Sequence, residues 1–335
     1  GSGGWEGSLL LSTNQDESGT GTRLRRDAQG QEIERADIAI DSPIKGGEAR
    51  LAGDFPFAGG TLRGNGSLTY QDYRTRERLS FATGPFGGTE ARIDDRIETV
   101  SGELGAEWTR QFGKALTSKV LLLGTRKDTA IRSASDEGGV TSDFASDSLA
   151  DERILRIALD RPSDGGLGWE AGGEIAYNSL GSRAGLTLDG LPFALPNSNV
   201  IITEWRGDLF GRIKWQLTPA FQAEGTIRAE QSALRQRDRS NGESYGRDFT
   251  YVKPKLALQW DIGARDQLRL RAEREVSQLD FSDFASTASL IEGTIDAGNA
   301  DLKPETAWIL EAAWERRFIR DGAVTMTLRH DRIDN

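Results

Sequence analysis

The sequence contains no cysteine and only one histidine and one methionine among its 335 residues. Without cysteine it has neither a disulfide framework nor a thiolate metal site, and one histidine supplies too few ligands for a transition-metal centre. Long hydrophobic runs are lacking too. The longest purely apolar run, Val120–Leu123, is far shorter than the roughly 20 residues of a membrane-spanning helix. A helical membrane protein is therefore excluded, and no metal site is expected.

An excess of positive charge is also absent, because 52 acidic residues face 42 lysines and arginines and the formal net charge is −10. No basic run offsets this balance, which argues against nucleic acid as a partner. The chain does have 40 glycines, 8 tryptophans, 5 tyrosines and 13 phenylalanines. This content is unusual for a soluble enzyme of this size. Because no Ser/His/Asp-type nucleophile or other catalytic constellation is visible, we expect neither an enzyme nor a cofactor.

Strict alternation of apolar and polar residues is the dominant pattern of the chain. Within 201–217, the apolar face carries Ile201, Thr203, Trp205, Gly207, Leu209, Gly211, Ile213, Trp215 and Leu217. The polar face carries Glu204, Arg206, Asp208, Arg212 and Lys214. The same separation recurs in 167–178, 221–230, 256–262, 268–272 and 308–314. Helical spacing fits none of these windows, so the pattern predicts an all-β protein with very little helix.

Short turns and long polar stretches alternate between the predicted strands. Turns containing Pro, Gly or Asp are predicted at 55–60, 112–115, 161–166, 217–220, 263–266 and 319–322. Long polar loops are predicted at 14–32, 74–95, 127–151, 178–199, 233–247 and 276–305. This order requires 33–54 to form one long strand, interrupted near 42–47, and predicts about thirteen strands. Short periplasmic turns and long extracellular loops are typical of a transmembrane antiparallel β-barrel.

A soluble β-sandwich is the alternative, because its strands alternate in the same way. Its strands average about five or six residues, however, and the apolar face of 201–217 is longer and rich in small residues that suit lipid contact. Trp205 and Trp215 would stand about 25 Å apart along the membrane normal at a tilt of roughly 40°, the height of an outer-membrane apolar band. The membrane barrel is therefore favoured. The predicted membrane-interface aromatics are Trp169, Tyr177, Trp205, Trp215, Trp260, Trp308 and Trp314.

The charged face of these strands would then line a lumen. Glu204, Arg206 and Asp208 come from one predicted strand, and Arg228 and Glu230 from the next. Opposite charges on adjacent strands can pair across the wall. A wall with both signs of charge suits a wide barrel that holds water or a polar plug. For most of these residues we expect solvation and no ligand role.

Residues 298–306 read Gly-Asn-Ala-Asp-Leu-Lys-Pro-Glu-Thr and precede the strand predicted around Trp308. The segment resembles the Asn-x-x-Leu-Lys-Pro-Glu motif of TonB-dependent outer-membrane receptors through Asn299, Leu302, Lys303, Pro304 and Glu305. Segments 5–12, 251–256 and 268–284 are also similar to that family. The resemblance implies a barrel of about 22 strands around an N-terminal plug. It also implies import of a scarce ligand, such as a ferric siderophore, a cobalamin or an oligosaccharide, with energy from TonB.

Compared with this family, the chain lacks a TonB box, a plug domain and a closing C-terminal strand. It opens with Gly1-Ser2-Gly3-Gly4 in place of a signal peptide and stops at Asn335 within a hairpin. We therefore expect residues 1–335 to be one β-barrel domain, truncated at both ends, in the bacterial outer membrane. The expected partners are outer-membrane lipid, lipopolysaccharide, an unidentified small-molecule ligand, and TonB through a plug outside this chain. A passive porin-like channel and a barrel that anchors surface adhesion or assembly stay open as alternatives.

Arginines in the predicted extracellular loops are the candidate ligand contacts. Arginine forks suit an anionic ligand, such as a siderophore or an acidic sugar, and equally suit lipopolysaccharide phosphates. The predicted ligand-binding residues are Arg74, Arg76, Arg78, Arg235, Arg237, Arg239 and Tyr245.

Two pairs of loop aspartates, Asp143 with Asp147 and Asp280 with Asp283, have the chemistry of calcium ligands. Loop aspartates are more often solvated turn formers, and we favour that role here. The sole histidine, His330, lies in a predicted strand and is expected in the lumen or at the membrane interface.

Overall fold

The computed structural model describes residues 3–113, 115–163, 166–291, 293–299, 301–319 and 322–334. Several predictions fall on positions outside the described residues. These are the turn residues Lys114, Asp164, Gly165, Arg320 and Asp321, the motif residue Ala300, and the chain ends Gly1, Ser2 and Asn335.

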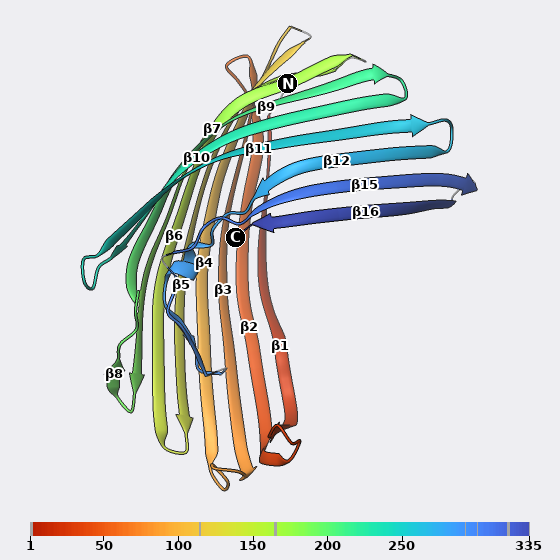
Figure 1. Ribbon diagram of the computed structural model, residues 1–335. Helices are drawn as coiled ribbons and strands as arrows, with labels where there is room; N and C mark the ends of the chain where they lie inside the picture. The colour runs from red at the N-terminus through yellow and green to blue at the C-terminus, as the bar shows by residue number, and fades with distance from the viewer. Residues whose placement is uncertain are drawn as a thin grey trace.

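One large antiparallel sheet dominates the structure, and its long strands follow one another in chain order (Figure 1). They are β1 (Gly4–Arg26), β2 (Glu32–Phe57), β3 (Gly60–Thr83), β4 (Glu90–Phe112), β5 (Leu116–Glu137), β6 (Val140–Arg161), β7 (Leu167–Leu188), β9 (Asn199–Thr218), β10 (Phe221–Asp238), β11 (Ser244–Ile262), β12 (Asp266–Val276), β15 (Thr306–Ile319) and β16 (Gly322–Asp334). The short β8 (Leu191–Phe193) pairs only with β7. The described residues thus form thirteen long strands, which confirms the prediction of about thirteen.

The segment predicted to be one long but interrupted strand is the continuous strand β2. The irregularity predicted near 42–47 corresponds to a shift in pairing with β1, where Gln15 pairs with Pro43 and Ser18 pairs with Asp41. A bulge of this kind adds a residue to one strand and leaves the partner strand unbroken. The prediction of a single strand is therefore confirmed.

The main prediction that the structure contradicts is that of long polar loops. Five of the six predicted loops are mostly paired strand, and the turn between β5 and β6 has shrunk to two residues, Gly138 and Gly139, with φ of 62° and 90°. Such left-handed backbone is what a tight hairpin turn requires. The physical reason is that these hairpins continue beyond the apolar band, where both faces meet polar surroundings. Polar composition there does not interrupt backbone pairing.

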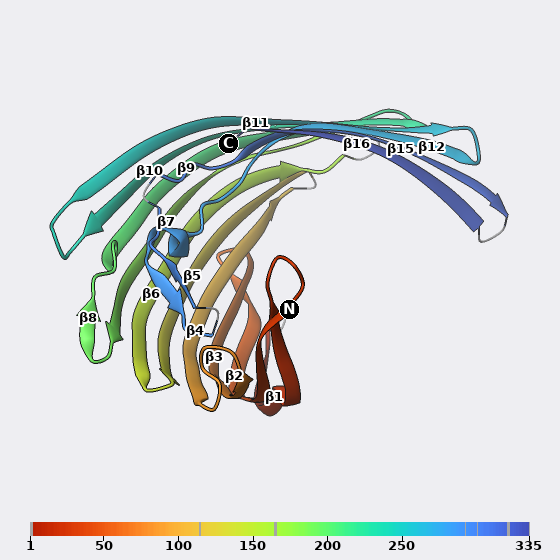
Figure 2. The same ribbon diagram turned by 60° about the horizontal axis from the view of Figure 1, so that its bottom comes forward.

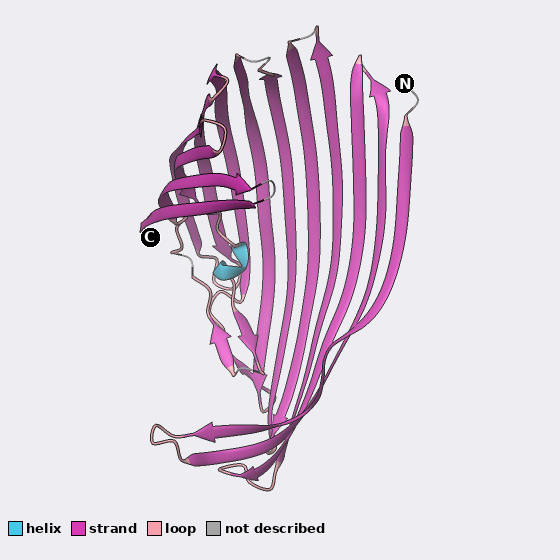
Figure 3. Ribbon diagram, turned by 90° about the vertical axis from the view of Figure 1, so that its right-hand side faces the viewer, coloured by secondary structure: helices cyan, strands magenta, loops and turns pink. Residues whose placement is uncertain are grey.

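The sixth predicted loop, between β12 and β15, is a true long connection. It contains the 3-10 helix η1 (Phe281–Phe284) and a separate two-stranded hairpin of β13 (Thr287–Ser289) and β14 (Thr294–Asp296). The large sheet curls into an open trough, and this connection lies on its concave face (Figures 2 and 3). We call the face that carries the connection the inner face and the opposite face the outer face.

The two faces of the wall invert the usual distribution of polarity. On β9 the outer-face residues Trp205 and Leu209 are 60% and 72% exposed, whereas the inner-face residues Arg206 and Asp208 are 9% and 5% exposed. A water-soluble sandwich would bury the apolar face and expose the charges. The sandwich alternative is therefore wrong, and the alternation separates an apolar outer surface from a charged interior.

Candidate functional site

The predicted interface aromatics all lie on the outer face. Tyr177 on β7 pairs with Trp205 on β9, with ring centroids 4.9 Å apart, and Trp169 pairs with Ile213. On the later strands, Trp260 pairs with Leu268, which pairs in turn with Trp314. The remaining two, Trp215 and Trp308, share their faces with Leu209 and Leu310 by alternation. Their place at a membrane interface stays a prediction.

The inner face of the wall is a lattice of ion pairs that cross from strand to strand, as the charge pattern predicted. Each pair joins neighbouring strands, and together they run from β7 to β15. The pairs are Arg212–Glu170 at 2.7 Å, Arg228–Asp208 at 3.3 Å, Lys253–Glu230 at 2.6 Å, Lys255–Glu273 at 3.0 Å and Arg269–Glu315 at 3.5 Å. Opposite charges at this spacing stabilise the sheet and leave its inner surface polar.

A ring held between two arginines belongs to this lattice. The guanidinium carbon of Arg156 on β6 lies 4.4 Å from the ring centroid of Phe210 on β9, and that of Arg228 on β10 lies 5.6 Å from it. Between β6 and β9 runs β7, which places Gly172 under the ring. The arrangement links three strands through cation–π contacts.

The connection between β12 and β15 is anchored to the inner face by Phe284, the last residue of η1. Phe284 is fully buried in a cluster with Leu180, Val200, Ile202, Leu234 and Ala285. Burial of this ring holds the connection over β7, β9 and β10. The signal in the sequence was the pair of phenylalanines at 281 and 284 inside the predicted loop 276–305, and the sequence analysis missed it.

The motif residues Asn299 and Glu305 shape the connection. The Asn299 backbone N–H donates to the Asp283 carbonyl at 2.8 Å, and its side-chain oxygen accepts from the Asp301 N–H at 2.8 Å. At the base, the Glu305 N–H donates to Oγ of Ser277 at 2.9 Å, and the Ser277 N–H donates to the Glu305 carbonyl at 2.9 Å. The motif thereby closes the connection where it leaves the sheet.

The rest of the motif supports the same fold. Leu302 packs against the Phe284 cluster, Lys303 is exposed, and Pro304 lines a cavity under the connection. Arg247 on β11 donates to the Asp301 carbonyl at 3.0 Å and also contacts its carboxylate. The motif therefore has a structural role here, and Arg247 is a residue of this region that the sequence analysis missed.

A polar cavity of about 490 Å³ lies between the connection and the inner face. Its wall side includes Lys127, Glu152, Asn178, Glu204, Arg206 and Glu230, and its connection side includes Gln278, Asp280, Phe281 and Ser282. The Asp280 carboxylate accepts from the Ser282 Oγ at 2.7 Å and the Ser282 N–H at 2.9 Å, and these hydrogen bonds lower the pKa of Asp280. This cavity brings charged groups, hydrogen-bonding groups and the Phe281 ring together on the inner face.

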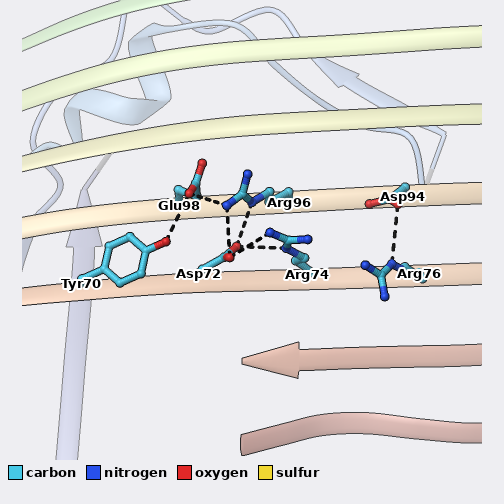
Figure 4. Close-up of polar contacts among 7 residues, drawn as sticks. All are labelled: Tyr70, Asp72, Arg74, Arg76, Asp94, Arg96 and Glu98. Atoms are coloured by element: carbon cyan, nitrogen blue, oxygen red, sulfur yellow. Dashed lines mark hydrogen bonds and ion pairs between the residues drawn. The ribbon is translucent and has the colours of Figure 1, made fainter. Parts of the chain in front are cut away.

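The first predicted arginine row lies on β3, so its assignment to an irregular loop is wrong. The alternation that places Leu68 and Tyr70 on the outer face also places Arg74, Arg76 and Arg78 there. Beyond the apolar band, Arg74 and Arg76 form ion pairs with carboxylates (Figure 4). Asp72 accepts from Arg96 at 2.9 Å and from Arg74 at 3.1 Å, and Arg76 lies 3.7 Å from Asp94.

The second predicted group is divided between the two faces. Arg235 and Arg237 lie on the outer side of β10, Arg239 lies in the following turn, and Arg235 donates to Asp248 at 2.9 Å. Tyr245 lies on β11 opposite the buried Gln236, which places it on the inner side. The structure thus does not bring Tyr245 and the arginines together, and contact of either with a ligand stays a prediction.

Other candidate sites find little support among the described residues. No group of three or more His, Asp or Glu side chains there is placed to share a metal ion. Asp147 pairs with Arg132 at 2.6 Å. His330 pairs with Leu310, which places it on the outer face and not in the lumen, and its position at the membrane interface stays a prediction. No helix in the described part of the chain is long and apolar enough to cross a membrane.

An all-antiparallel wall with an apolar outer face and an ion-paired inner face defines the class as an outer-membrane-type β-barrel wall. The family model described as "TonB dependent receptor-like, beta-barrel" matches residues 46–335. The chain belongs to this family, and the resemblance found in the motif is confirmed. No curated protein sequence matches the chain.

Solved structures of similar fold include three receptors. The siderophore receptor PiuA from Acinetobacter baumannii has a TM-score of 0.54 and 10% sequence identity over 97% of this chain. The ferric yersiniabactin uptake receptor FyuA from Yersinia pestis has a TM-score of 0.54 and 11% identity over 96% of this chain. The ferric-catecholate import receptor Fiu from K12 E. coli has a TM-score of 0.53 and 9% identity over 97% of this chain. The chain spans 56%, 54% and 58% of these proteins, just over half their length.

Proposed function

We propose that this chain is part of the barrel wall of an outer-membrane receptor that imports a scarce ligand with energy delivered by TonB. The observation that carries the proposal is the family match over 46–335, joined to an inner face of paired charges. Such an inner face suits contact with water or with a polar plug, because a small closed barrel would fill its interior with side chains. The plug and TonB contact would come from sequence outside this chain.

The ligand is proposed to be a ferric siderophore, with a cobalamin or an oligosaccharide as the other members of the class. The three receptors of similar fold are described as siderophore, ferric yersiniabactin and ferric-catecholate receptors. The cavity under the β12–β15 connection supports a route for a polar ligand, because Lys127 and Arg206 are placed there beside carboxylates and hydroxyls. No reaction is proposed, in keeping with the receptor family.

The test is uptake by cells that carry the full-length protein. A strain that lacks its own receptors would be supplied with radiolabelled ferric siderophores, in the presence and absence of functional TonB. Uptake that requires both the protein and TonB is the expected result. TonB-independent uptake together with a stable conductance in planar bilayers would replace the proposal with a passive channel. Cell binding without any uptake would favour a barrel that anchors adhesion or assembly.

A further inference from the structure

Arg153 on β6 is an outward-facing arginine at the level of the Tyr177–Trp205 aromatic pair. It pairs with Gly124 on one side and with Tyr177 on the other, and its guanidinium carbon lies 6.0 Å from the Tyr177 ring centroid. Among the described residues, no carboxylate lies within 4.0 Å of it. The nearby Asp151 is paired with Arg126 at 3.6 Å. A lipid-facing cation without a counter-charge is costly, and an anion at this level would relieve the cost.

Arg153 is one of the residues that line an open apolar groove on the outer face, which runs from Trp5 on β1 to Trp205 on β9. Its lining includes the small residues Gly64, Gly66 and Gly124 and the large residues Leu104 (75% exposed) and Leu122 (51% exposed). The groove has a volume of about 1450 Å³. Small-molecule sites usually measure roughly 300–1,000 Å³. The groove is open and its apolar lining crosses several strands, which suits an occupant with several hydrocarbon chains.

Three side chains that can donate hydrogen bonds, Arg153, Tyr177 and Ser179, line this groove close together, beside the Trp205 indole and the Asp151 carboxylate. Tyr177 and Ser179 are successive outer-face residues of β7, and Arg153 lies directly opposite Tyr177. In the described part of the chain, none of these three side chains donates a hydrogen bond to another residue. A guanidinium and two hydroxyls beside an apolar groove suit a phosphate attached to acyl chains.

We propose that this groove binds the lipid A part of lipopolysaccharide, with a lipid A phosphate on Arg153, Tyr177 and Ser179 and the acyl chains along Leu104 and Leu122. Lipid A is chosen because Arg153 stands at the end of the apolar outer-face run of Leu155, Ile157 and Leu159 that is farther from the short turn after Arg161. That end faces the cell exterior if the chain is oriented as a receptor barrel, so the inference rests on the proposed function for its orientation. It adds a lipid site that the import proposal does not require.

The test measures lipid binding by the full-length protein in detergent, by native mass spectrometry. Three probes are compared: bisphosphorylated lipid A, dephosphorylated lipid A and phosphatidylglycerol. The wild-type protein should prefer bisphosphorylated lipid A, and Arg153→Gln should weaken that binding roughly tenfold, the loss expected for a charge-assisted hydrogen bond. Arg235→Gln is the matched control, because Arg235 is an outward arginine that already has Asp248 as its partner at 2.9 Å.

Equal binding by Arg153→Gln and the wild type would overturn the proposal, as would equal binding of the dephosphorylated probe. Equal retention of phosphatidylglycerol would assign the groove to a phospholipid and overturn the choice of lipid A. Heat-modifiable migration in gels shows that each variant is folded. TonB-dependent uptake measured with the same variants separates the two proposals, because Arg153→Gln should keep uptake while it loses lipid A. Absence of TonB-dependent uptake by the wild-type protein would count against the import proposal alone.

Discussion

Gly172 on β7 lies directly beneath the ring of Phe210 on β9, so that a Cβ atom at residue 172 would stand 2.6 Å from Cζ of that ring. The same atom would meet the carbonyl oxygen of Ile157 at 2.3 Å. The absence of a side chain lets Phe210 reach across β7 to Arg156. The inner wall therefore depends on a glycine at this position for contact between strands that are not neighbours.

Substitution of this glycine is expected to destabilise the wall. Gly172→Ala should lower the free energy of unfolding by about 1–3 kcal/mol, because both obstructing groups are packed and one is backbone. Denaturant unfolding of the full-length protein in detergent measures the change. The control is Gly211→Ala, on the outer face of β9, where an added Cβ meets nothing within 4 Å. Similar losses for the two variants would contradict the steric explanation.

Removal of the Phe284 ring should release the β12–β15 connection while the sheet stays intact. Phe284→Ala leaves a cavity against Ile202 and Leu234, and large-to-small changes of this kind cost about 3–5 kcal/mol in packed cores. Amide hydrogen exchange should become faster in 277–305 and stay unchanged in β9. Ile295→Ala is the control, because Ile295 is 48% exposed. Unchanged exchange in 277–305 would mean that Phe284 does not anchor the connection.

The outer ionic network makes a prediction about pH. Hydrogen bonds from Arg96 first, and then from Arg74, hold the pKa of Asp72 at about 2. A lowered folded-state pKa contributes stability that is present above the ordinary pKa of 3.8 and is lost as the pH falls through about 2. Asp72 should therefore stay ionised at pH 3. A carboxyl carbon NMR titration measures this, and Arg96→Gln should move the midpoint up toward 3.8.

The control for this titration is Arg110→Gln, which removes an arginine whose side chain donates to the Ala58 carbonyl and not to Asp72. It should leave the midpoint unchanged. A midpoint near 3.8 in the unaltered protein would show that the network does not form in solution.

The depth of the aromatic residues tests the orientation of the wall. In variants with a single tryptophan, Trp205 and Trp215 should be quenched most by lipids brominated near the headgroup. A tryptophan placed by Leu209→Trp, midway between them on the outer face, should be quenched most by lipids brominated deep in the chain. The same depth for all three positions would contradict a band bounded by Trp205 and Trp215.

Much of the fold could be predicted because alternation is a local property of the pleated backbone. The faces of β9, the number of long strands and the continuity of β2 follow from side chains two residues apart. The loops could not be predicted, since beyond the membrane polar residues occupy both faces and pairing continues without a change in composition. Arg74 and Arg76 were therefore assigned to a loop although they lie on β3.

The candidate site was less accessible to sequence reasoning. The motif ending at Glu305 identified the family, yet its structural role depends on Ser277, 28 residues earlier. The grouping of Tyr245 with Arg235 and Arg237 failed, because positions near each other in sequence stand on opposite faces of the sheet. The Phe284 anchor is a contact with residues more than 80 positions away at Ile202, which no local pattern reveals.

By itself the sequence determined which residues face outward, since a period of two commits each side chain to one face of the wall. Trp205, Leu209 and Trp215 follow from that rule alone. Only the tertiary structure decided which distant residues meet, because the register of long antiparallel strands sets cross-strand neighbours that composition does not encode. That register placed Arg96 on Asp72, left Arg153 beside Tyr177 without an acidic partner among the described residues, and brought Phe210 over Gly172.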